Sequence, residues 1–162
     1  MKKIILAVCI VFMGAYATQA QVRVGGTIGY GTQAEAIGLG VIGDYMIKDN
    51  IGIAANFAYY FTERNEFAKT SFWEFNANVN YYFTETGSLE MYGIGGLNYS
   101  RSTVSIQGLG FDFGGSVGEI GLNLGIGSNF DIGKNFFPFA EMKYVVSKFD
   151  QLVIQAGVKF EL

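Results

Sequence analysis

The sequence has no histidine and, among its 162 residues, only one cysteine and one proline. The lack of histidine excludes metal sites built on imidazole ligands and catalytic schemes that rely on a histidine base. A single cysteine, Cys9, cannot form a disulfide within the chain, so the fold is not held by such bonds. No run of basic residues occurs and the formal net charge is −3, which argues against nucleic acid as a partner.

Clear helix signals are missing as well. No stretch joins a helical period of apolar residues to capping residues, and no linker or low-complexity tract divides the chain. Glycine, phenylalanine and tyrosine are instead abundant, with 23, 15 and 10 residues. This composition indicates a single all-β domain.

Residues 1–20 have the pattern of a cleavable secretory signal peptide. Lys2 and Lys3 precede an apolar run, which ends in small residues suited to cleavage before Gln21. The apolar run is too short for a membrane-spanning helix. We therefore expect a mature domain of residues 21–162, whose formal charge changes from −3 to −5 when the two lysines are removed.

Alternation of apolar and polar residues with a period of two predicts eight strands in the mature chain. Most exceed the usual strand of about five or six residues and suit tilted strands that cross a bilayer with about nine to eleven residues. Short turns alternate with longer connections, as in membrane barrels. The expected strands are 22–31, 36–47, 51–62, 71–83, 89–102, 117–131, 136–147 and 151–162.

The strand expected at 89–102 is the least regular of the eight. Tyr92 and Ile94 fall on the face that is otherwise polar. Either a bulge in the strand or a partly apolar interior accounts for this pattern.

The stretch SFWEFNANVNYYF, residues 71–83, raises the question of which face of the sheet contacts water. Trp73, Phe75 and Val79 alternate with Glu74 and several asparagines. A soluble, lipocalin-like barrel would turn the apolar face inward, whereas a membrane barrel would turn it outward.

The positions of the aromatic residues favour a membrane barrel. They gather at the two ends of the apolar faces, with mostly aliphatic residues between them, and two aromatic girdles around an aliphatic band are typical of membrane barrels. Near the short turns these residues are Tyr45, Tyr81, Phe83, Phe130, Phe136 and Phe160; near the longer loops they are Tyr30, Phe57, Tyr59, Phe61, Trp73, Phe75, Tyr99 and Tyr144. The polar face is then expected to fill the interior, where glycines leave room for longer neighbours.

Charged residues of both signs lie on this polar face, as burial requires. We expect Lys143 to compensate Glu119 or Glu141. Glu119 and Glu141 also allow a carboxylate pair of a hydrolase, but charges held by their neighbours are the favoured interpretation. The expected interior charge network comprises Arg23, Asp44, Glu74, Glu119, Glu141, Lys143 and Lys159.

The final residues, QAGVKFEL, resemble the terminal signal by which outer-membrane barrels are recognised by the barrel assembly machinery. Gln155, Gly157, Phe160 and Leu162 match its polar, glycine, aromatic and terminal apolar positions; Leu162 departs from the commoner terminal aromatic residue. With the strand pattern, residues 21–162 resemble the small eight-stranded OmpX/OmpA-type outer-membrane β-barrel family. The resemblance implies insertion in outer-membrane lipid and contact with the assembly machinery during biogenesis.

The hairpin TVSIQGLGFDF, residues 103–113, is the best candidate for a specific role. If the alternation continues beyond the bilayer, Val104, Ile106, Phe111 and Phe113 share one face that points toward the barrel axis. Such a hairpin caps the barrel or offers an edge to an extracellular partner.

The sequence thus predicts an all-β, eight-stranded antiparallel up-and-down transmembrane barrel. We expect it to be a monomer without cofactors or metals. We expect a non-enzymatic protein of the outer membrane with a structural or surface-interaction role. A lipocalin-like binder of small molecules and a narrow pore are the alternatives. The pore is disfavoured because eight strands leave an interior that side chains fill.

Overall fold

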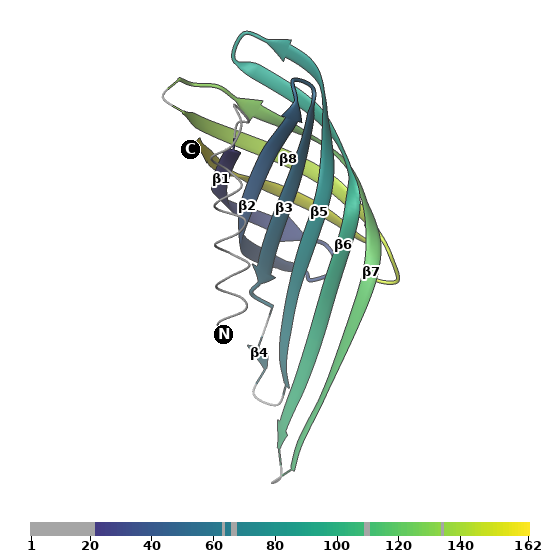
Figure 1. Cartoon of the computed structure of the whole chain (residues 1–162). Helices are drawn as coiled ribbons and strands as arrows, with labels where there is room; N and C mark the ends of the chain where they lie inside the picture. Colours follow the sequence, from purple (N-terminus) through teal and green to yellow (C-terminus); the bar gives the residue numbers. More distant parts are fainter. Residues whose placement is uncertain (1–21, 63, 66–67, 109–110, 134) are drawn as a thin grey trace, which may run out of the picture.

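The computed structural model of the chain describes residues 22–62, 64–65, 68–108, 111–133 and 135–162. These residues form one antiparallel β-sheet that curls into a barrel (Figure 1). No described helix is long and apolar enough to cross a membrane. The strands are β1 (Val22–Gly31), β2 (Ala36–Lys48), β3 (Ile51–Tyr60), β4 (Arg64–Asn65), β5 (Ala68–Thr86), β6 (Leu89–Gly108), β7 (Phe111–Phe130), β8 (Phe136–Val146) and β9 (Gln151–Glu161).

Eight long strands close the barrel, which confirms the predicted architecture. Each pairs with the next along the chain, β1 pairs with β9, and the pairing of β3 with β5 passes over the short β4. Arg64 and Asn65 of β4 pair only with the first residues of β5. The sequence pattern did not predict this small strand, because two residues are too few to show a period.

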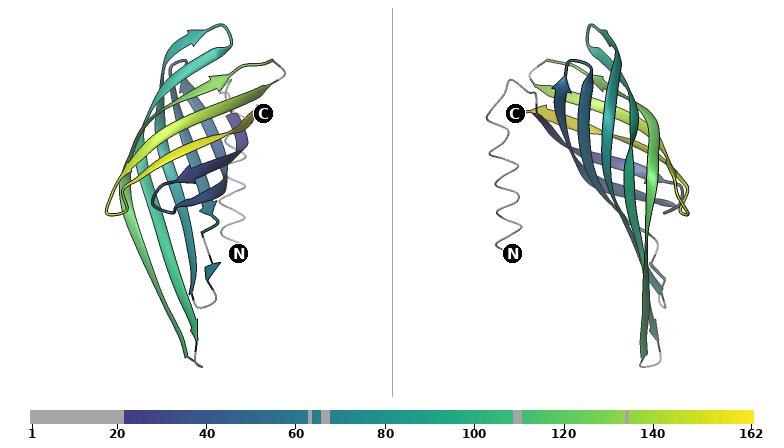
Figure 2. Two further views of the ribbon diagram at one scale, coloured as in Figure 1. Left: turned by 180° about the vertical axis from the view of Figure 1, so that it is seen from behind. Right: turned by 45° about the vertical axis from the view of Figure 1, so that its right-hand side comes forward.

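The two ends of the barrel differ in their connections. At one end, here called the turn end, the described chain begins and ends and three short turns join the strands (Figures 1 and 2). Positive φ angles at Gly87 (61°), Gly133 (77°) and Asn135 (55°) tighten two of these turns. The opposite end, called the ribbon end, carries the long β6–β7 hairpin.

Three strands continue far beyond the barrel wall at the ribbon end. β5, β6 and β7 are each longer than expected, and Figure 2 shows them projecting as a twisted ribbon. β6 and β7 remain in register from Ser102 opposite Val117 to Gly108 opposite Phe111. Most of the hairpin expected at residues 103–113 is therefore regular strand.

The apolar face of the barrel points outward. On β7, Ile120 and Leu124 are 73% and 60% exposed, whereas the intervening Asn123 is completely buried. Trp73 lies in the outer wall between Phe57 and Tyr99, with ring centroids 5.8 and 5.6 Å away. The orientation expected for a membrane barrel is confirmed, and the lipocalin-like alternative, which needs the opposite orientation, is wrong.

Tyr92 and Ile94 lie inside the barrel. Both are buried and pack with Tyr82, so the irregular pattern of this strand reflects a partly apolar interior near the turn end. A β-bulge also occurs here, between Tyr82 and Thr84 of the neighbouring β5. Gly127 of β7 makes room for the Tyr92 ring, which a Cβ atom at this position would overlap.

Candidate functional site

The barrel interior holds a buried set of charged side chains. Six of them are at most 5% exposed and comprise three cations and three anions, so the buried charge is balanced. The cations are Arg23, Lys143 and Lys159, and the anions are Asp44, Glu74 and Glu141. They come from β1, β2, β5, β8 and β9, because each occupies an inward position of its strand.

Glu74 is the centre of the polar cluster nearer the ribbon end, called the Glu74 cluster. Lys143 Nζ lies 3.1 Å from Glu74 Oε1, and Gln151 Nε2 donates to Oε2 at 2.7 Å. Further donors to the same carboxylate are the Tyr60 hydroxyl and the side-chain amides of Asn76 and Asn98. A fully buried carboxylate is thus paired with a cation and supplied with hydrogen bonds, as its burial requires.

A row of asparagines continues from the Glu74 cluster along the inner wall of the barrel. Asn56, Asn76 and Asn98 lie opposite one another on β3, β5 and β6. Asn76 donates to Asn56 Oδ1 at 3.1 Å and accepts hydrogen bonds from Asn98 and Asn123, both at 2.9 Å. Asn123 also donates to Asn78 Oδ1 at 2.7 Å. The row follows the inner wall across the adjacent strands β3, β5, β6 and β7.

Lys159 organises a second cluster nearer the turn end, called the Lys159 cluster. Its ammonium lies 2.6 Å from Asp44 Oδ2 and 4.0 Å from Glu141 Oε1. It also stands over the Phe139 ring, 4.3 Å from the centroid. Glu141 accepts hydrogen bonds from the Tyr92 hydroxyl at 2.7 Å and from Gln155 Nε2 at 2.5 Å.

Arg23 closes the interior at the turn end. Its guanidinium donates to both carboxylate oxygens of Glu90, at 2.7 and 3.1 Å, lies 3.7 Å from Glu161, and stacks over Phe137 at 3.9 Å. Asn129 connects this pair to the Lys159 cluster, since it donates to Glu90 and accepts from Lys159. Side chains therefore fill the lumen from the ribbon end to the turn end.

Glu119 does not belong to the buried network. It lies toward the ribbon end of β7 and faces Lys148, at 3.5 Å, whose side chain is 82% exposed. Gly127, and not Glu119, is opposite Glu141 in the β7–β8 register, so the carboxylate pair that the sequence allowed as an alternative is not formed. The expected compensation of Glu119 or Glu141 by Lys143 is also wrong, because Lys143 pairs with Glu74 across the lumen.

Three network residues were not identified from the sequence. Tyr60, Tyr92 and Gln151 are buried and donate to Glu74 or Glu141. Each lies on the inward parity of its strand, which was the available signal. These three residues were missed because the network was predicted from charged residues alone, and their side chains are uncharged.

The four residues of the proposed terminal signal lie on β9 or directly after it. Gln155 faces inward and donates to Glu141. Gly157 lies next to the Phe139 ring. Phe160 faces outward and contacts Phe136 edge-on, with centroids 5.2 Å apart. Leu162 is 73% exposed, and its backbone N–H donates to Val22 O at 2.9 Å.

The ribbon presents a free strand edge. β8 first pairs with β7 at Leu122, opposite Val146, so the described registers give residues 111–120 of β7 a partner only in β6. Val104 is 39% exposed. The side chains of Ile106, Phe111 and Phe113 lie outside the described part of the structure, although their backbones continue the β6–β7 ladder.

The charged side chains of the interior clusters are paired and hydrogen-bonded with one another. Among the described residues, no group of three or more acidic, histidine or cysteine side chains could hold a metal ion. The buried carboxylates of the interior already accept hydrogen bonds from cationic or amide donors. Nothing in this arrangement positions a free nucleophile with an adjacent base.

Solved structures share this fold at low sequence identity. Ail, the attachment invasion locus protein of Yersinia pestis, is 16% identical with a TM-score of 0.64, and the alignment covers 88% of this chain and 97% of that one. The N-terminal β-barrel domain of Pseudomonas aeruginosa OprF is 19% identical with a TM-score of 0.67 over 88% and 97% of the two chains. Neisserial surface protein A is 17% identical with a TM-score of 0.63 over 90% and 98%.

No curated protein sequence matches the chain significantly. A family model does match, and its alignment spans residues 4–161. The closed eight-stranded barrel, its apolar outer wall and its polar interior agree with that match. The chain therefore belongs to the outer membrane protein beta-barrel domain family.

Proposed function

We propose that the chain is a closed, non-enzymatic barrel of the outer membrane that binds a partner at the cell surface through its ribbon. The free edge of β7, residues 111–120, carries this proposal. Outer-membrane barrels have short periplasmic turns and longer outer loops, so the ribbon end faces the cell exterior. The partner then approaches from outside the cell.

Unpaired backbone groups make the β7 edge suitable for strand addition. An exposed edge offers a row of N–H and C=O groups to an extended segment of another chain. Gly114, Gly115 and Gly118 leave much of this edge without bulky side chains, and no proline or lysine occurs along it. Natural edges that avoid such pairing commonly carry those residues.

One structure with the same fold supports the type of role that we propose, which is binding at the cell surface. Ail has been solved in complex with the heparin analogue sucrose octasulfate, and its name describes attachment. For the present chain we take from this only that an eight-stranded barrel of this shape serves as a platform for extracellular binding.

The experiment compares bacteria that display the protein with and without an open edge. Gly115→Lys combined with Val117→Lys places charges on two exposed edge positions, while Ile132→Lys adds a charge at the turn end as the matched control. Adhesion to immobilised extracellular proteins and to heparin is measured for each. Loss of adhesion only in the edge variant supports the proposal; equal adhesion by all three proteins, or by a chain lacking residues 104–113, contradicts it.

We also infer that residues 1–20 are removed on export and that the terminal residues guide assembly. The basic start and short apolar run support cleavage before Gln21. Intact mass of protein extracted from outer membranes tests this, because a mature chain begins at Gln21. Replacing Phe160 by alanine should reduce the amount of assembled barrel more than the same change at outward-facing Phe130.

A further inference from the structure

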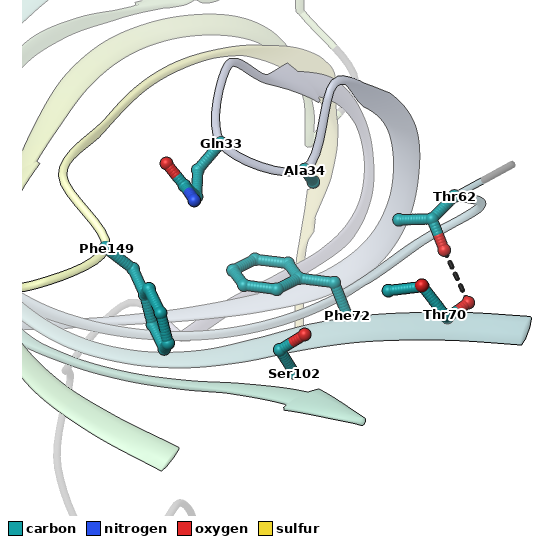
Figure 3. Close-up of a pocket in the computed structure, with 7 residues that line it drawn as sticks. All are labelled: Gln33, Ala34, Thr62, Thr70, Phe72, Ser102 and Phe149. Carbon is teal, nitrogen blue, oxygen red and sulfur yellow. Dashed lines mark hydrogen bonds between the residues drawn. The ribbon is translucent and has the colours of Figure 1, made fainter. Parts of the chain in front are cut away.

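We propose that the ribbon end of the barrel contains a binding site for one neutral sugar unit. The site is a pocket of about 230 Å³ at the mouth of the lumen (Figure 3). It is lined by the β1–β2 and β8–β9 turns, by Thr62 just after β3, and by residues within β5 and β6. The lining side chains include Gln33, Thr62, Thr70, Phe72, Ser102 and Phe149.

Two phenyl rings provide an apolar surface in this pocket. Phe72 is buried and is held by an edge contact with Tyr60, with centroids 5.4 Å apart. Phe149 is half-buried, and its backbone N–H donates to Ser147 Oγ at 2.9 Å, which fixes the β8–β9 turn. Figure 3 shows both rings and the Gln33 side chain around the same space. A sugar ring presents a face of C–H groups that packs against such aromatic surfaces.

Apart from Ala34, the remaining lining side chains are polar and uncharged. The Gln33 amide and the Ser102 hydroxyl both donate and accept hydrogen bonds, as sugar hydroxyls do. The Thr62 hydroxyl already donates to the backbone carbonyl of Thr70 and keeps a lone pair to accept another bond. None of the described lining residues is charged, so an ionic ligand would lose hydration without gaining a counter-charge.

Two residues close in sequence to the pocket lining carry buried polar atoms. Ser100 Oγ and Gln151 Oε1 have no hydrogen-bond partner among the described groups, and both residues are 1% exposed. They are two residues from Ser102 and Phe149, on the same inward parity of their chain segments. The polar lining of the pocket thus continues into the polar barrel interior.

The size of the pocket limits the ligand. Sites for drug-sized molecules have roughly 300–1,000 Å³, so this pocket accepts a single ring with its substituents. Since the pocket opens at the outer mouth, the unit can be the end of a longer glycan that continues outside. The site is separate from the β7 edge, and its failure leaves the proposed strand addition untouched.

Nuclear magnetic resonance in lipid nanodiscs tests the site. Glycoside detergents are avoided because their head groups are sugars. The isotope-labelled barrel is titrated with glucose, galactose and N-acetylglucosamine, and with glucose 6-phosphate as the charged comparison. At least one neutral sugar is expected to cause saturable shifts of the amides of Gln33, Ser102 and Phe149. Phe149→Ala should weaken this binding by roughly tenfold.

Phe61→Ala is the matched control, because Phe61 is an exposed aromatic residue near the same end but outside the pocket. It should bind as the unchanged protein does. Gln33→Ala, in an exposed turn, replaces Phe149→Ala if that variant does not fold. Three results overturn the proposal: no saturable shifts with any neutral sugar, equal binding by the pocket variants, or tighter binding of glucose 6-phosphate than of glucose.

Discussion

At the scale of single residues, Lys143 and Glu74 form the most completely buried ion pair of the described interior. A buried pair is only weak evidence for stability, but removal of one partner leaves an uncompensated charge. The hydrogen-bond donors around Glu74 lower the cost of burying its carboxylate, and Lys143 supplies the compensating positive charge.

We expect Lys143→Met to lower the free energy of unfolding by about 3–5 kcal/mol. Reversible denaturation in lipid vesicles measures the change. The double variant Lys143→Met with Glu74→Gln should recover much of the loss, because the buried charge is then also removed. Lys148→Met is the control: its side chain is 82% exposed, and such surface pairs contribute about 0–1 kcal/mol. A loss at Lys143 no larger than at Lys148 contradicts the pairing.

Gly127 gives a second prediction at this scale. Gly127→Ala places a methyl group against the Tyr92 ring, and overpacking of this kind costs about 1–3 kcal/mol. The same denaturation assay applies. Gly95→Ala is the matched control, because no atom lies within 4 Å of a Cβ at that position. Equal stability of the two variants would show that the Tyr92 ring moves aside without cost.

At the scale of elements, strand positions were predictable wherever one face meets the interior and the other the outer wall. β1 was expected at 22–31 and is found at those residues, because its outward positions are apolar except at Gly26. The lengths of the three ribbon strands, β5, β6 and β7, were underestimated. Beyond the barrel, residues 114–118 are all exposed, and Gly114, Gly115 and Gly118 interrupt the alternation of apolar and polar residues. The sequence pattern is therefore lost there, although the backbone pairing of β6 and β7 continues.

The interior was predictable in composition but not in pairing. Parity places Lys143 and Glu74 inside. Their contact, however, crosses the lumen between β8 and β5, which are not neighbours in the sheet. Such contacts depend on strand tilt and stagger, which the pattern of one chain does not contain.

The outer wall of β5 gives a prediction of its own. Trp73 is the only tryptophan in the sequence and lies in the outward aromatic group near the ribbon end. Its emission should therefore be quenched by lipids brominated near the head group, more than by lipids brominated at the chain ends. The Trp73→Phe variant supplies the background. Stronger quenching by aqueous acrylamide than by either lipid contradicts this placement.

At the scale of the whole molecule, the Glu74 cluster, the Lys159 cluster and the Arg23–Glu90 ion pair block the lumen one after another. Eight-stranded barrels have interiors just wide enough for side chains to fill. Here the filling is polar and extensively hydrogen-bonded, so the molecule combines an apolar outside with a solid polar inside.

Single-channel recording of the refolded protein in planar bilayers should detect no stable conductance. The folded barrel should also resist detergent and change its gel mobility on heating, which verifies that the recorded protein is folded. A variant with Lys143, Glu74 and Gln151 all replaced by alanine tests the blockage, because it removes the centre of the Glu74 cluster. Large, stable channels formed by the unchanged protein would contradict a closed lumen.

The asparagine row also bears on how the barrel reaches its correct alignment. Asn56, Asn76 and Asn98 face one another only in the native register. A slip of one residue in any of these strands would turn its asparagines from the lumen to the bilayer, where an unsatisfied polar group costs several kcal/mol. The asparagine row thereby favours the native strand register during folding, because a misaligned strand would expose its asparagines to lipid.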